Sequence, residues 1–73
     1  MVYPLALKSC EHARQLSEVA AESGLRLTVS FNNTILDPRS ILGLLTLVGK
    51  NVMLVAPDHS SPKDFWKLIQ KVC

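Results

Sequence analysis

The chain has 73 residues, of which 48% are hydrophobic and 19% charged, and this composition is typical of a globular protein and excludes an intrinsically disordered one. Lys and Arg (8) exceed Asp and Glu (6) only slightly and are scattered, and aromatic residues make up 5%, so nucleic acid is not an expected partner. No apolar run is long enough for a signal peptide or a membrane span, so we expect a cytoplasmic protein without membrane insertion.

Residue types that bind metals or carry out redox chemistry are scarce. The chain has two cysteines and two histidines, and their spacing matches neither a zinc site nor a redox motif. We therefore expect no bound metal, no cofactor, and reduced thiols at Cys10 and Cys73. The length is that of one domain, which we expect to span residues 1–73.

The hydrophobic pattern predicts seven elements. Strict alternation of apolar and polar residues over 25–31 is typical of a strand with one buried face. Other segments have apolar residues at helical spacing, and Gly24 and Ser61 supply a stop and a start signal for two of these helices. In chain order the elements are a strand over residues 2–8, a helix over 13–23, strands over 25–31 and 34–36, a short helix over 40–48, a strand over 51–56, and a final helix after Ser61.

This order predicts an α+β fold with two layers. Pro4 favours an edge position or a local irregularity in the first strand, whereas the apolar run over residues 51–56 favours a central position. Three helices on one face of a four-stranded sheet would leave the other face, with Arg26, Thr28 and Ser30, in water.

His12 and Arg14 stand where the first helix is predicted to begin. The first N–H groups of a helix lack intrahelical acceptors and, together with the positive end of the helix dipole, favour an anion such as phosphate. We expect the backbone at Ala13 and Arg14 to cradle such a group, and the Arg14 guanidinium to hold two of its oxygens. A neutral imidazole is a nucleophile near pH 7, so His12 is a candidate phosphoryl acceptor. Two solvated polar residues at a helix end are the alternative interpretation.

Two segments of the chain resemble the histidine-containing phosphocarrier protein HPr of the bacterial sugar phosphotransferase system. The segment "EHARQL", residues 11–16, is similar to the histidine signature of that family, and "RSILGLLTL", residues 39–47, is similar to the segment around its regulatory serine. The resemblance covers essentially the whole chain and includes the element order. It implies the HPr-like fold, an open-faced sandwich in which a four-stranded antiparallel sheet carries three helices on one face, in the order βαββαβα.

The resemblance implies a phosphoryl carrier and not an enzyme. HPr-like proteins accept a phosphoryl group from Enzyme I, which takes it from phosphoenolpyruvate, and pass it to an Enzyme II A component in sugar uptake. His12 matches the phosphorylated residue, which uses Nδ1 in the family, and Arg14 matches the arginine that steadies the phosphoryl group. Ser40 matches the regulatory serine, which implies a serine kinase/phosphorylase as a further partner. The apolar patch that such proteins offer to Enzyme I and to Enzyme II A components is matched by Ile41, Leu42 and Leu45.

Three positions beside the histidine depart from the family pattern. Cys10, Glu11 and Gln15 stand where the family usually has a glycine, an apolar residue and a proline. A carboxylate beside the imidazole favours its protonated form and repels an incoming phosphoryl group. Two other functions therefore stay open: a regulatory HPr-like protein with weak or no phosphotransfer, and a structural or assembly protein that shares only the fold. Outside these motifs, we expect His59 to be solvated and Trp66 to be a partly covered core aromatic.

Overall fold

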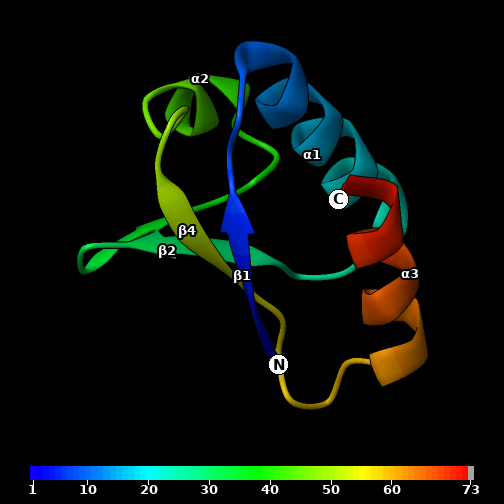
Figure 1. Cartoon of the computed structure of the whole chain (residues 1–73). Helices are drawn as coiled ribbons and strands as arrows, with labels where there is room; N and C mark the ends of the chain where they lie inside the picture. Colours follow the sequence, from blue (N-terminus) through cyan, green and yellow to red (C-terminus); the bar gives the residue numbers. More distant parts are fainter. Residues whose placement is uncertain (73) are drawn as a thin grey trace.

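The computed structural model describes residues 1–72, and its elements follow the predicted order (Figure 1). Cys73, expected to carry a reduced thiol, lies outside the described residues. No helix within residues 1–72 has both the length and the apolar character needed to cross a membrane. The elements are β1 (Val2–Ala6), α1 (Cys10–Ser23), β2 (Thr28–Phe31), β3 (Thr34–Leu36), α2 (Ile41–Leu45), β4 (Asn51–Val55) and α3 (Pro62–Val72).

The four strands form one antiparallel sheet in the order β1-β4-β2-β3. The apolar strand β4 is central, between β1 and β2, as its composition predicted. β1 lies at an edge, where Pro4 is paired with Met53 of β4. An edge strand tolerates proline because the proline nitrogen, which has no N–H to donate, can face away from the neighbouring strand. The predicted edge and central positions are therefore confirmed.

β2 and β3 form a hairpin through a two-residue turn. Asn32 and Asn33 both have positive φ, 46° and 65°, and the flanking Phe31 and Thr34 are paired. Two positive φ angles are the requirement of the hairpin turn whose twist matches that of the strands, and asparagine adopts them more readily than most residues. β2 begins at Thr28, three residues later than predicted, since its pairing to β4 begins there.

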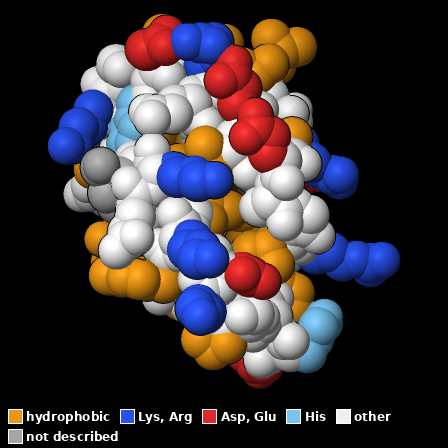
Figure 2. All heavy atoms as spheres, turned by 90° about the vertical axis from the view of Figure 1, so that its right-hand side faces the viewer, with side chains coloured by type: hydrophobic (Ala, Val, Ile, Leu, Met, Phe, Trp, Pro, Cys, Tyr) orange, Lys and Arg blue, Asp and Glu red, His pale blue; other side chains and the backbone are white. Residues whose placement is uncertain are grey.

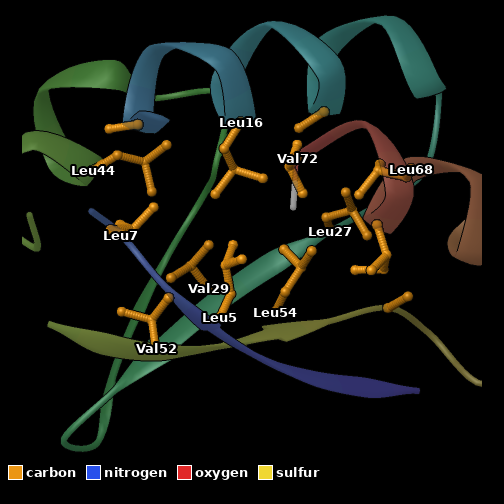
Figure 3. Packing of buried hydrophobic residues seen from close by; sticks show 14 of the residues in the cluster. Leu5, Leu7, Leu16, Leu27, Val29, Leu44, Val52, Leu54, Leu68 and Val72 are labelled. Atoms are coloured by element: carbon orange, nitrogen blue, oxygen red, sulfur yellow. The ribbon is translucent and has the colours of Figure 1, made fainter. Parts of the chain in front are cut away.

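The core lies between the sheet and the three helices, which cover one of its faces (Figures 1 and 3). Leu16 of α1, Val29 of β2 and Leu44 of α2 are completely buried. Each such side chain stabilises the fold by about 1.5–3 kcal/mol relative to an exposed position. Trp66, predicted to be partly covered, is 55% exposed, because the buried stripe of α3 passes on the other side of that helix, through Phe65, Leu68, Ile69 and Val72.

The boundaries of α1 and α2 differ from the prediction. α1 begins at Cys10, because Ser9 has an extended backbone and its Oγ accepts a hydrogen bond from the His12 N–H at 3.1 Å. α2 ends at Leu45, because the chain then turns: Thr46 Oγ1 donates to the Gly43 carbonyl at 2.6 Å. In both helices the end is set by a hydrogen bond of a side chain to the backbone, which the spacing of apolar residues does not predict.

Candidate functional site

His12 lies in the first turn of α1, half-buried, where the end of α3 meets it. The Lys8 N–H donates to His12 Nδ1 at 3.2 Å, and Nε2 lies 2.5 Å from the Val72 carbonyl oxygen, 60 residues further along the chain. A carbonyl only accepts and an amide N–H only donates, so this hydrogen-bond pattern assigns the ring proton to Nε2. Neutral His12 therefore keeps a lone pair on Nδ1.

The contact with Val72 fixes both the tautomer and the orientation of the imidazole. The ring nitrogen that carries no proton is the nucleophilic atom of histidine, and its identity is set by the hydrogen bond that the other nitrogen makes. When Nδ1 forms a bond, positive charge develops on the ring, and a hydrogen bond from Nε2 to a carbonyl oxygen stabilises that charge. The geometry thus makes Nδ1 the nucleophilic atom of His12, and its lone pair becomes available for attack when the hydrogen bond from the Lys8 N–H opens.

The backbone donors at this helix end differ from the expectation. Ser9 Oγ accepts from the His12 N–H, and the Ser9 carbonyl accepts from the Ala13 N–H at 3.0 Å. The N–H groups of Ala13 and Arg14 therefore lie within the helix and are not free to cradle a phosphate. The early start of α1 is the reason, since only the first turn of a helix has N–H groups without intrahelical acceptors.

Arg14 is held by two carboxylates on the exposed side of α1. Its Nε donates to Glu11 at 3.2 Å, its Nη2 contacts the other Glu11 oxygen, and its Nη1 donates to Glu18 at 2.5 Å. All three guanidinium nitrogens thus donate to a carboxylate. Hydrogen bonding to Arg14, and then its positive charge, lowers the pKa of Glu11, while the same hydrogen bond and both carboxylates raise the pKa of Arg14. Glu11 pairs with Arg14, whereas the sequence suggested that it acts on the imidazole.

Ser40 lies at the start of α2, beside α1. It occupies the capping position with an extended backbone, but its exposed side chain makes no capping hydrogen bond. Beyond it Leu42 is 76% exposed and Leu45 38% exposed, whereas Ile41 is partly buried against the core. α2 packs on α1, and Ser17 Oγ donates to the carbonyl that precedes Ser40 at 3.2 Å. The residues matched to the apolar docking patch therefore lie next to the helix that carries His12.

Sequence reasoning missed Ser9, Glu18 and the Val72 carbonyl. A serine just before a helical pattern is a capping signal, and it was available at Ser9. Glu18 stands four residues after Arg14, a spacing at which side chains on a helix meet. No sequence signal marks the Val72 carbonyl, because every residue type carries one. Within residues 1–72, Cys10 is an exposed free thiol, and no group of three or more His, Cys, Asp or Glu residues is placed to hold a metal ion.

Comparison with known proteins shows the fold. No protein-family model and no curated protein sequence matches the chain. Among solved structures, it is similar to the crystal structure of HPr-C-His from Thermoanaerobacter tengcongensis, with a TM-score of 0.75 and 18% sequence identity. The match covers 99% of this chain and 90% of that chain. The chain is thus an α+β open-faced sandwich, and its fold is the HPr-like fold predicted from the sequence.

Proposed function

We propose that this protein is a single-domain phosphoryl carrier that accepts a phosphoryl group on Nδ1 of His12 and passes it on, without being an enzyme. One observation carries the proposal: Nε2 is held by the Val72 carbonyl, and Nδ1 keeps the lone pair. The HPr-like fold supports it. By the resemblance, the donor is Enzyme I charged from phosphoenolpyruvate and the acceptor is an Enzyme II A component, in the cytoplasmic part of bacterial sugar uptake.

The transfer is a substitution at phosphorus. Nδ1 of His12 forms the new P–N bond, while the bond between phosphorus and the donor atom breaks and that atom leaves with the electron pair. The proton stays on Nε2, so the ring becomes positively charged, and its hydrogen bond to the Val72 carbonyl strengthens. The Lys8 N–H loses Nδ1 as its acceptor and then lies beside the new phosphoryl oxygens, to which it donates.

Arg14 has to exchange partners in order to steady the phosphoryl group. A phosphoryl group carries about two negative charges and competes with the single charges of Glu11 and Glu18 for the guanidinium. The three side chains are more than half exposed, and solvent and salt screen such pairs strongly. The two carboxylates therefore slow the exchange without preventing it.

The test is phosphorylation by Enzyme I and radiolabelled phosphoenolpyruvate. Wild type is expected to carry an acid-labile, base-stable label, which is the behaviour of a phosphoimidazole. His12→Ala is expected to carry none, while His59→Ala, which removes an exposed histidine far along the chain, is labelled like wild type. Far-UV circular dichroism verifies that both variants are folded. A full label on folded His12→Ala would overturn the proposal.

The cluster of Glu11, Arg14 and Glu18 favours a second candidate, a regulatory HPr-like protein with weak or no phosphotransfer. The cluster carries two negative charges and one positive charge, so its net charge opposes an anion. Such a protein would respond to a serine kinase/phosphorylase at Ser40. It would bind its partners through Ile41, Leu42 and Leu45. Labelling of wild type by Enzyme I distinguishes the candidates: a carrier is labelled on His12, whereas a regulatory protein gains label only when the double variant Glu11→Gln/Glu18→Gln removes the opposing charges.

A further inference from the structure

The exposed side of α3 carries a row of basic side chains with an aromatic residue beside it. Lys63, Lys67 and Lys71 recur every fourth residue, so they lie along one side of the helix. All three are exposed, and the ion pairs within residues 1–72 are made by other cations. Trp66, the only tryptophan of the chain, is 55% exposed next to this row. We call these four residues the α3 row.

Acidic side chains lie close to the lysines of α3, among them Glu22 of α1. The two helices pack against each other, and Gln15 Nε2 donates to the Lys71 carbonyl at 2.9 Å. The shallow groove between them is lined by Glu22 of α1 and by Asp64, Lys67 and Lys71 of α3, among others. On this side of the molecule basic side chains form a column, with a run of acidic ones above its upper end and a single acidic side chain beside it (Figure 2). The face therefore presents both signs of charge close together.

The C-terminal end of the α3 row lies next to the proposed phosphorylation site. Val72, the residue after Lys71, supplies the carbonyl that holds His12 Nε2. A partner that lies along α3 thus reaches His12 at the end of that helix. The patch matched to the family's docking surface lies elsewhere, on α2. The α3 row is thus placed for a separate contact with a protein that reacts at His12.

We propose that the α3 row is a docking surface for the protein that donates the phosphoryl group, an inference that rests on the proposed function. The partner's surface places acidic side chains against the lysines, basic ones against Glu22 of α1, and an apolar depression around Trp66. Charge complementarity of this kind speeds association and sets the orientation of docking. Tryptophan is enriched among the residues that carry most of the binding free energy in interfaces.

The charge pattern selects a protein over a polyanion. Glu22 and Asp64 border the lysines in the groove, and they repel the continuous negative charge of nucleic acid or of an anionic bilayer. The apolar stripe of α3 is buried in the core, so it is not available to enter a membrane as the apolar face of an interfacial helix does. A protein surface can present both signs at the required places.

The experiment measures binding and phosphorylation separately. Calorimetry gives the Kd of Enzyme I for the full chain in a His12→Ala background, where the proposed transfer cannot occur. Lys67→Glu and Trp66→Ala are each expected to raise this Kd about tenfold, whereas Arg26→Glu, a charge reversal in the loop after α1, changes it less than about twofold. A fluorotryptophan label at the single tryptophan is expected to shift its ¹⁹F resonance on binding.

The outcomes separate this inference from the proposed function. Binding that weakens in the α3 variants, with no label on His12 in the wild-type background, keeps the docking surface and rejects the carrier function. Labelling of His12 with an unchanged Kd in Lys67→Glu and Trp66→Ala rejects the docking surface alone. No binding of Enzyme I also rejects it, as does a ¹⁹F shift produced by phosphatidylglycerol vesicles or single-stranded DNA but not by Enzyme I.

Discussion

Replacing Ser9 by alanine tests how the structure positions His12. Ser9 Oγ accepts the His12 N–H at 3.1 Å, so Ser9→Ala leaves that N–H without its capping partner at the start of α1. Loss of such a cap costs about 1 kcal/mol. A chain of 73 residues has a free energy of unfolding of roughly 4–11 kcal/mol, so the loss is a substantial fraction. We expect the Tm to fall by about 4–8 °C in thermal denaturation followed by far-UV circular dichroism.

Two further variants separate the cap from other effects. Ser9→Asn restores a good capping group and is expected to recover most of the lost stability. Ser61 caps α3, because its Oγ accepts a hydrogen bond from the Asp64 N–H at 3.4 Å. Ser61→Ala should therefore lower the Tm without changing the imidazole NMR signals of His12. Ser9→Ala should broaden or shift those signals. An unchanged Tm in Ser9→Ala, or no recovery in Ser9→Asn, would refute the assignment of Ser9 as the cap.

Other predictions address the core, the docking patch and pH. Leu16→Ala empties a fully buried site and should lower the free energy of unfolding by about 2–5 kcal/mol in urea titrations; a loss below 1 kcal/mol would contradict the packing. Leu42→Asp changes a side chain that is 76% exposed, so the Tm should stay nearly constant while affinity for an Enzyme II A component falls; equal affinity would exclude the patch. Because Arg14 lowers the pKa of Glu11, their pair stabilises the fold at neutral pH and is lost only as the pH falls through that lowered pKa. A carbon NMR titration should show a Glu11 pKa below the usual range of a glutamate that rises in Arg14→Ala, and equal values in the two proteins would contradict the pairing.

The element order and the sheet positions were predictable because they depend on apolar spacing and on local backbone preferences. The turn at Asn32 and Asn33 follows from the tolerance of asparagine for positive φ. The central place of β4 follows from its apolar composition, and the edge place of β1 from Pro4. In each case the residues that determine the turn or the strand position belong to that turn or strand. They can therefore be recognised in a single sequence.

The details of the site depend on contacts that apolar spacing does not report. The first turn of α1 buries little, so its start is decided by the Ser9 hydrogen bond and not by periodicity. Glu11 pairs with Arg14 because both side chains lie on the exposed side of one helix, which the sequence alone did not distinguish from a contact with His12. The contact between His12 and Val72 joins a side chain to a main-chain carbonyl 60 residues away, and only the three-dimensional fold brings them together.

The most direct test of the account is the position of the phosphoryl group on the ring of His12. Long-range ¹H–¹⁵N correlation spectra of the protein, recorded before and after incubation with Enzyme I and phosphoenolpyruvate, distinguish the two ring nitrogens. We expect a proton on Nε2 in the free protein and, after incubation, phosphorylation at Nδ1 with the Nε2 proton retained. Phosphorylation at Nε2, or an imidazole that remains unmodified with a competent Enzyme I, would contradict it.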